Sequence, residues 1–186
     1  MEDSYQELIR NCIQQDRKAQ ELLYHTFSKK MYGVCLGYAK DRDEAKDILQ
    51  EGFIKVFANL KKYTAEGNNF EGWIRRVIVN TAIDHYRKSI KEQTSVNIEN
   101  IPDIASSCSV LEAMGAQELV VLIEKLPEGA RIIFNLYVVE GYTHKEIAQI
   151  MNISEGTSKS QFSRGKQLLQ GWLNKTYSNN TLTKLY

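Results

Sequence analysis

The chain has 186 residues, of which 42% are hydrophobic and 25% are charged, and its formal net charge at pH 7 is +1. This composition is typical of globular proteins and excludes collagen-like and disordered chains. No apolar run approaches the roughly 20 residues that a membrane helix requires. The N-terminus, Met1-Glu2-Asp3-Ser4, lacks the basic and apolar segments of a signal peptide. We therefore expect a cytoplasmic protein with no direct membrane insertion.

Cysteine and histidine residues are few and widely spaced. They are Cys12, Cys35, Cys108, His25, His85 and His144. No Cys-x-x-Cys pair is present, and no histidine pairs with a cysteine at metal-ligand spacing. We therefore expect buried or incidental thiols in a reducing compartment, with no metal site and no cofactor.

Basic residues are concentrated in two segments although the net charge is close to zero. Residues 61–88 carry six Lys and Arg against three acidic residues, and residues 154–186 carry five against one. Residues 91–125 show the reverse, with two basic residues against six acidic ones. Two basic segments around an acidic middle suit a protein that contacts nucleic-acid phosphates at two places.

Apolar residues recur at steps of three and four in the first half of the chain, which is typical of amphipathic helices. The pattern predicts helices over residues 16–40, 44–60 and 70–88. If residues 1–14 add a short helix, these segments form a compact bundle over residues 1–88.

Helical periodicity fails over residues 89–110, which we interpret as a linker. It resumes in a second domain over residues 111–176, where we expect four helices. The first covers about 111–125, and Pro127 occupies the first turn of the next, where its missing N–H costs nothing. Residues 177–186 are expected to form a tail. The fold class predicted from this pattern is all-α, with two small helical domains joined by a linker.

The last two helices of the second domain lie close together in residues 143–169 and have strong local signals. Thr143 followed by Glu146 forms a capping box that fixes the start of the first helix. Asn152 tolerates the left-handed backbone conformation that a sharp turn requires. Ser154 is suited to cap the second helix.

The second of these helices is poor in acidic residues and carries Lys159, Arg164 and Lys166. A helix-turn-helix of this kind places its second helix in the major groove of duplex DNA. An αα-hairpin with a solvated basic face has the same pattern, so local signals alone leave both interpretations open.

Two segments of the first domain resemble a known family. Residues 47–57 read Asp-Ile-Leu-Gln-Glu-Gly-Phe-Ile-Lys-Val-Phe, and residues 70–88 begin Phe-Glu-Gly-Trp-Ile-Arg-Arg. Both resemble the second conserved region of the sigma factors of bacterial RNA polymerase, and residues 126–169 resemble the fourth. Because the chain passes directly from one region to the other, it is similar to the small group IV, or extracytoplasmic function, sigma factors.

The resemblance implies that the helix over 44–60 docks on the coiled-coil clamp of the polymerase β′ subunit and that the β flap is a further contact. The residues that it assigns to core-polymerase binding are Asp47, Gln50, Glu51 and Phe53. We expect the first three to share a polar face opposite the apolar stripe. A merely solvated helix face would show the same pattern.

The resemblance also implies that the first domain binds the downstream, minus-ten promoter element as melted single strand, with one base flipped into a pocket. The residues assigned to this element are Lys61, Lys62, Tyr63, Asn68, Asn69, Phe70, Arg75, Arg76, Asn80, Asp84, Arg87 and Lys88. Asn80 is the strongest single candidate, and Arg75 and Arg76 are expected to contact phosphates. Phe70 suits base contact and core packing equally, whereas we assign Trp73 to the core.

The upstream, minus-thirty-five element is expected to be recognised as duplex by the helix-turn-helix. The residues assigned to it are Thr143, Lys145, Ser154, Glu155, Thr157, Ser158, Lys159, Gln161, Ser163, Arg164 and Lys166. The sequence departs from the family pattern at Ser158, where valine is common, and at Gly165, where alanine is common. We expect Gly165 to cost about 1 kcal/mol of helix stability.

The expected function is therefore that of a sigma factor, which directs promoter-specific initiation and catalyses no covalent change. Its expected partners are core RNA polymerase, promoter DNA and an anti-sigma factor, with no small-molecule substrate. A dimeric helix-turn-helix regulator is the alternative, but that function assigns no role to the helix that carries Gln50 and Glu51. An enzyme using Asp84 and His85 is disfavoured, because adjacent helical residues point in different directions.

Overall fold

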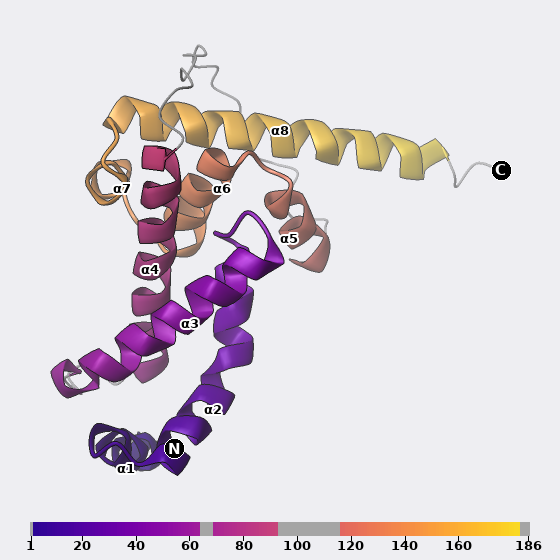
Figure 1. Cartoon of the computed structure of the whole chain (residues 1–186). Coiled ribbons are helices and arrows are strands. Elements are labelled where there is room, and N and C mark those ends of the chain that lie inside the picture. The colour runs from indigo at the N-terminus through magenta and orange to yellow at the C-terminus, as the bar shows by residue number, and fades with distance from the viewer. Residues whose placement is uncertain (1, 64–68, 93–115, 183–186) are drawn as a thin grey trace. The chain divides into compact units, whose positions relative to one another are not determined.

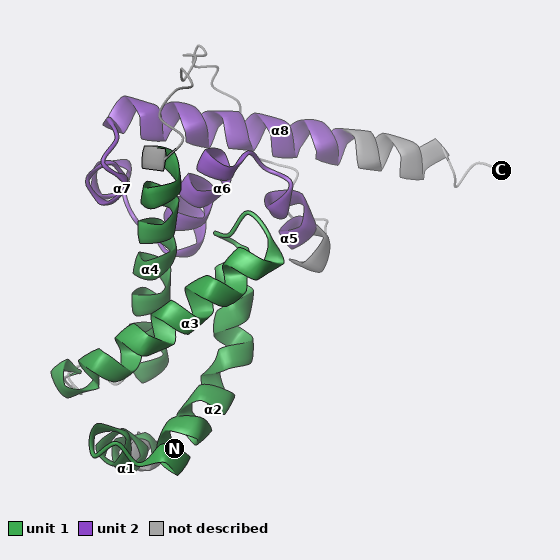
Figure 2. Cartoon of the chain, in the orientation of Figure 1, with its two compact units in different colours: residues 1–94 green, residues 95–186 purple. Residues whose placement is uncertain are grey.

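The computed structural model describes residues 2–63, 69–92 and 116–182, and every regular element in these ranges is a helix (Figure 1). The predicted all-α class is confirmed. The chain divides into two compact units, Met1–Thr94 and Ser95–Tyr186, which we describe separately (Figure 2). Among the described helices, none combines the length and hydropathy needed to cross a membrane.

The first unit is a bundle of helices. Its elements are α1 (Glu2–Ile13), α2 (Arg17–Leu36), α3 (Arg42–Asn59), the short 3-10 helix η1 (Leu60–Lys62) and α4 (Phe70–Glu92). Asp16 and Asp41 cap α2 and α3, and the Asp16 carboxylate accepts a hydrogen bond from the Ala19 N–H at 2.8 Å. Helix α4 extends four residues past the predicted end at 88, into the segment predicted as linker. The predicted linker residues 93–110 lie outside the described ranges.

Helices α2, α3 and α4 pack against one another along their apolar faces. On α3 the buried residues follow the predicted stripe and include Ala45, Ile48 and Val56. Gly52 is also buried, and a Cβ atom at this position would overlap the side chain of Ile78 on α4. The absence of a side chain at position 52 therefore allows α3 and α4 to approach closely.

Aromatic rings close one end of this bundle. The ring of Phe70, only 5% exposed, lies 5.7 Å from that of Phe27, 5.0 Å from that of Tyr63 and 5.9 Å from that of Trp73, between ring centroids. Tyr5 of α1 joins the cluster through Phe27 and Phe70. Phe70 is thus a core residue that anchors the start of α4.

The second unit is also helical in its described part. Its elements are α5 (Ala116–Glu124), α6 (Glu128–Phe134), the π-helical turn η3 (Asn135–Val139), α7 (His144–Met151) and α8 (Glu155–Leu182). Pro127 immediately precedes α6, one position before the predicted one. Helix α8 continues through Leu182, into the segment predicted as a tail.

Helices α7 and α8 are joined by the predicted tight turn. The capping box is formed, because the Thr143 hydroxyl accepts from the Glu146 N–H and the Glu146 carboxylate accepts from the Thr143 N–H at 2.8 Å. Asn152 has φ 55° and ψ 48°, the left-handed conformation expected for it. The Ser154 hydroxyl accepts from the Thr157 N–H at 2.9 Å and caps α8.

Helix α8 packs on α6 and α7 through one face. Ile147 and Met151 of α7 are buried, as predicted from the periodicity. Another buried cluster combines residues of α8 with residues from the α5–α6 region; its members are Leu126, Phe134 and Leu169, with Leu122, Ile123, Phe162, Leu168 and Trp172 packed around them. Gly165 is buried on this face, and a Cβ atom there would lie 3.7 Å from Ala130 and from Leu126, an ordinary van der Waals contact.

Replacing Gly165 by alanine should stabilise the second unit by about 0.5–1 kcal/mol, because alanine loses less backbone entropy in a helix and its methyl group fits the space available. Thermal unfolding of the full chain measures this change. Gly171→Ala is the matched control, because Gly171 lies on the same helix and a Cβ atom there would meet nothing within 4 Å, so that this variant isolates helix propensity. A lower melting temperature for Gly165→Ala but not for Gly171→Ala would contradict the packing described above.

Candidate polymerase and DNA-binding surfaces

The outer face of α3 is exposed and carries both polar and apolar side chains. Asp47 and Gln50 are exposed, as predicted for a docking surface, and Ile54 is 68% exposed. These three residues stand three or four positions apart, so their side chains are neighbours along one strip of the helix. Ile54 was not predicted as a contact residue, although its helical spacing from Asp47 and Gln50 could have indicated it.

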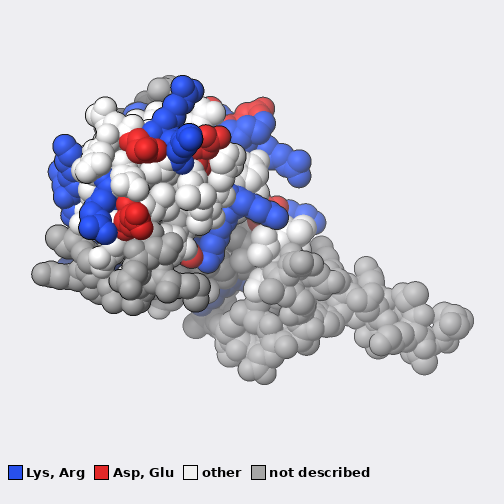
Figure 3. Space-filling view, turned by 90° about the horizontal axis from the view of Figure 1, so that it is seen from below, with Lys and Arg blue, Asp and Glu red and all other residues white. Residues whose placement is uncertain are grey.

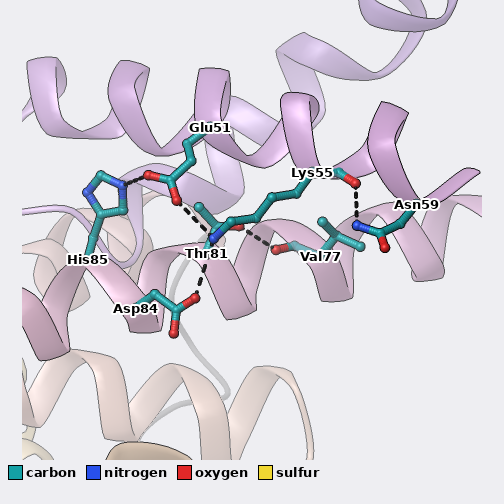
Figure 4. Close-up of polar contacts among 7 residues, drawn as sticks. All are labelled: Glu51, Lys55, Asn59, Val77, Thr81, Asp84 and His85. Atoms are coloured by element: carbon teal, nitrogen blue, oxygen red, sulfur yellow. Dashed lines mark hydrogen bonds and ion pairs between the residues drawn. The ribbon is translucent and has the colours of Figure 1, made fainter.

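Glu51 stands four positions from Asp47 and so borders this strip, but its carboxylate is held by contacts within the first unit. Figure 4 shows its carboxylate directed toward α4, where one oxygen lies 2.7 Å from the Nε2 atom of His85. The other accepts from the Lys55 Nζ group at 2.9 Å, and Lys55 also contacts Asp84 at 3.4 Å. Glu51 therefore connects α3 to α4.

These contacts favour the ionised form of the Glu51 carboxyl group. The hydrogen bond from Lys55 lowers the pKa of the Glu51 carboxyl group, and the bond to His85 adds to this effect, although partial burial opposes it. An ionised Glu51 between two donors favours the observed arrangement of the two helices. Because the carboxylate is about one-third exposed, solvent screening limits the stabilisation that the network provides.

Phe53 is 2% exposed and packs against Tyr24, with ring centroids 4.8 Å apart. A side chain so deeply buried offers little surface to a partner in this structure. Phe53 was predicted to contact the polymerase directly, and the structure places it in the core, beneath the α3 strip.

The outer face of α4 carries polar and basic groups. Arg76, Asn80 and Arg87 are exposed and stand at helical spacing on one side, with Asp84 between the last two and Lys88 exposed beside them. This arrangement agrees with the predicted continuous face. Arg75, by contrast, is half-buried on another side of the helix and does not extend the strip.

The segment before α4 contributes fewer exposed groups than predicted. Lys61 and Lys62 are exposed on η1, whereas Tyr63 is half-buried against Trp73, with centroids 5.4 Å apart. Asn69 is exposed, but its side-chain oxygen accepts from the Gly72 N–H at 2.7 Å and holds the first turn of α4. Asn68 lies outside the described residues.

The burial of Phe70 decides between the two roles left open for it. Its ring lies within the core cluster, so the residue does not offer an exposed stacking surface. Trp73, expected to be core, is only partly buried and stacks on Phe70 with an interplanar angle of 12°. Tyr63 and Trp73 are both half-buried, in contrast to Phe70.

In the helix-turn-helix, most of the predicted upstream-element residues reach the surface. Those that are exposed or half-buried are Thr143, Lys145, Ser154, Glu155, Thr157, Lys159, Gln161, Ser163, Arg164 and Lys166. Glu155 and Lys159 form an ion pair at 2.8 Å, and the Lys166 ammonium group lies 5.0 Å from the centroid of the Phe162 ring. Charges on this helix are thus partly paired within the unit.

Ser158 is the exception, since it is 0% exposed. Its hydroxyl lies 2.9 Å from the Nδ1 atom of His144, and the His144 ring stacks on Tyr137 with centroids 4.5 Å apart. Ser158 was predicted to face the bases or the backbone of the upstream element, whereas in this structure its buried hydroxyl faces His144. His144 was not predicted as a site residue, although the serine at a position where valine is common indicated a buried hydroxyl that needs a partner.

The face drawn in Figure 3 shows Lys and Arg side chains interspersed with Asp and Glu side chains. Among the described residues, no group of three or more His, Cys, Asp or Glu side chains is placed to hold a metal ion.

The stability of the second unit should fall as the pH decreases below about 6.5. Burial lowers the pKa of folded His144, and Lys159 and Lys166 act in the same direction, whereas Glu155 opposes them. Because the folded pKa is lower than the unfolded one, the unfolded chain binds the proton first, and stability is lost from the unfolded pKa downward.

Melting temperatures between pH 7.5 and pH 5, values on either side of about 6.5, measure this effect. The decrease should be smaller in His144→Phe than in the wild-type chain, whereas His25→Phe, a change at an exposed histidine of α2, should leave it unaltered. Equal decreases in the wild-type chain and His144→Phe would show that His144 does not contribute.

Comparison with known proteins identifies the family of the chain. The family model for sigma-70 region 2 matches residues 23–91, and that for sigma-70 region 4 matches residues 116–169. The RNA polymerase sigma-H factor of Pseudomonas aeruginosa is 27% identical over 180 residues, which cover 88% of this chain and 91% of that protein. The ECF RNA polymerase sigma factor SigM of Bacillus subtilis is 28% identical over 155 residues, which cover 82% and 94%.

A solved structure is also similar, that of the sigma factor RpoE in complex with the anti-sigma factor NepR from Bartonella quintana. It is 23% identical, with a TM-score of 0.48, and the match covers 83% of this chain and 96% of that chain. Two regional models matched in order, with relatives aligned over most of their length, establish the assignment. The chain belongs to the sigma-70 family, in which it groups with the extracytoplasmic function RNA polymerase sigma factors.

Proposed function

We propose that this chain attaches to core RNA polymerase through the outer face of α3 and recognises promoters through two separate DNA-binding surfaces. Its family membership already makes it a non-enzymatic factor that directs transcription initiation by RNA polymerase. The observation that supports the finer assignment is that α3 and α4 each bury one face and leave a polar strip exposed on the other.

The polymerase contact is assigned to Asp47, Gln50 and Ile54, which would dock on the β′ clamp helices. An acidic group, an amide and an exposed apolar side chain on one strip provide charge complementarity and apolar burial together. Glu51 contributes indirectly, by connecting α3 to α4. The β flap is the proposed contact of the second unit.

The melted downstream strand is assigned to α4 and η1. The amide of Asn80 offers a donor and an acceptor for a base edge, while Arg76, Arg87, Lys61 and Lys62 offer positive charge for phosphates. The half-buried rings of Tyr63 and Trp73 would provide planar contacts near the start of α4. Flipping a base costs a few kcal/mol, which these contacts must offset.

The upstream duplex is assigned to the first turns of α8, with Lys159, Gln161 and Arg164 toward the major groove and Thr143 and Lys145 of α7 toward the backbone. Such a protein works beside RNA polymerase in the cytoplasm, and the family resemblance implies that an anti-sigma factor restrains it. Neither role requires a cofactor.

A gel-shift experiment with core RNA polymerase and a library of promoter duplexes tests the proposal. The chain alone should shift promoter DNA weakly, and the chain with core enzyme should shift a distinct subset of the library strongly. Tight binding of palindromic duplex by a dimer of the chain without polymerase would contradict the proposal.

Asp47→Ala and Gln50→Ala should each weaken binding to core polymerase by about tenfold, the effect of removing one important interface side chain. Neither should change the melting temperature, because both side chains are exposed. Titration of fluorescently labelled chain with core enzyme measures the affinity, with Lys18→Ala on α2 as the matched exposed control.

Glu51→Gln should instead lower the free energy of unfolding by about 0.5–1 kcal/mol, because it weakens the contacts with Lys55 and His85.

Variants of the two DNA surfaces should affect different steps of initiation by the holoenzyme. Asn80→Ala should slow strand opening severalfold, measured by fluorescence of a reporter base, while closed-complex binding stays nearly unchanged, because its contact forms only with melted DNA. Arg164→Ala should weaken closed-complex binding by about threefold to tenfold, as expected for one lost DNA contact. The reverse pattern would contradict the assignment of the surfaces.

A further inference from the structure

The helix-turn-helix contains a polar pair where its two helices meet. Ser158 of α8 is 0% exposed, and its hydroxyl lies 2.9 Å from the Nδ1 atom of His144 at the start of α7. The imidazole tautomer determines which group donates. Buried polar groups require a partner, and this pair supplies one for both groups at a position where the family commonly has valine.

The His144 ring is held from two further directions. Tyr137 of η3 stacks on it at 4.5 Å with an interplanar angle of 17°, and Phe162 of α8 meets it edge-on at 5.5 Å. The imidazole of α7 thus contacts two other elements of the unit, η3 and α8. With the ring fixed in this way, the direction of the hydrogen bond to Ser158 is fixed as well.

A directional contact at this position constrains α8 in a way that apolar packing does not. Contacts between apolar side chains tolerate small rotations of a helix, whereas a hydrogen bond weakens steeply as its angle departs from linear. Ser158 lies between Thr157 and Lys159, which are assigned to the upstream element. A rotation of α8 about its axis would move all the DNA-facing side chains together.

We propose that His144 and Ser158 form a positioning pair, which sets the rotation of α8 and thereby determines which base pairs of the upstream duplex its exposed side chains contact. This proposal rests on the proposed function of α8. It makes His144 a residue that influences sequence preference without itself contacting a base.

The test uses holoenzyme assembled from core polymerase and the full-length chain, with a promoter library in which only the upstream positions are randomised. His144→Phe keeps an aromatic ring but removes both nitrogen atoms, and Ser158→Ala removes the hydroxyl. Each should reduce discrimination among upstream sequences by about threefold to tenfold, as expected when one buried partner is lost. Loss of folded protein lowers the amount of active complex but does not change these ratios.

The double variant His144→Phe/Ser158→Ala should lose no more discrimination than the worse single variant, since the two residues act as one unit. Losses that multiply in the double variant, or unchanged preferences in both single variants, would overturn the proposal. If Arg164→Ala alters binding but the pair variants do not, this proposal alone fails. If the wild-type holoenzyme shows no upstream preference and Arg164→Ala has no effect, the proposed function fails with it.

Nitrogen NMR of the histidine side chains provides a test that does not depend on how well the variants assemble. The Nδ1 signal of His144 in the full chain should shift in Ser158→Ala, whereas the signals of His25 should not. An Nδ1 signal that is insensitive to Ser158→Ala would show that the pair does not exist in solution and would overturn the proposal.

Discussion

The packing of α3 against α4 is the constraint on which the first unit depends. Each helix has one apolar face, and burying these faces together leaves their polar faces exposed. Gly52 permits the close approach of the helices, and the Glu51 contacts with Lys55 and His85 connect them at the edge of the contact. The strip proposed for polymerase and the strip proposed for melted DNA are therefore fixed relative to each other by one helix–helix contact.

In the second unit, local hydrogen bonds and backbone conformation position the two helices of the helix-turn-helix. The capping box at Thr143, the left-handed Asn152 and the Ser154 cap determine where α7 ends and where α8 begins. The His144–Ser158 pair then adds a directional contact between the two helices. A short turn and one buried hydrogen bond orient the start of α8, whose exposed side chains are the ones proposed to contact DNA.

Sequence-based prediction succeeded for interactions between residues a few positions apart and failed for contacts between distant parts of the chain. Capping residues and Asn152 act within a few positions, so their roles could be predicted from the sequence alone. The outer strips followed from helical periodicity, which also identified Asn80 and Gln50 as exposed. The family resemblance assigned Glu51, Phe70 and Ser158 to the polymerase or to DNA. The structure also shows contacts of these side chains within the chain, to His85, Phe27 and His144, which lie 14 or more positions away and which helical periodicity could not indicate.

The central claim is that the outer faces of α3 and α4 bind different partners at the same time. Photocross-linking from a light-sensitive amino acid placed at position 50, and separately at position 80, tests it directly in complexes of the chain with core polymerase and promoter DNA. The account predicts that position 50 cross-links to polymerase and position 80 to the non-template strand, the second only after strand opening. Cross-linking of both positions to the same partner, or of neither to any partner, would contradict it.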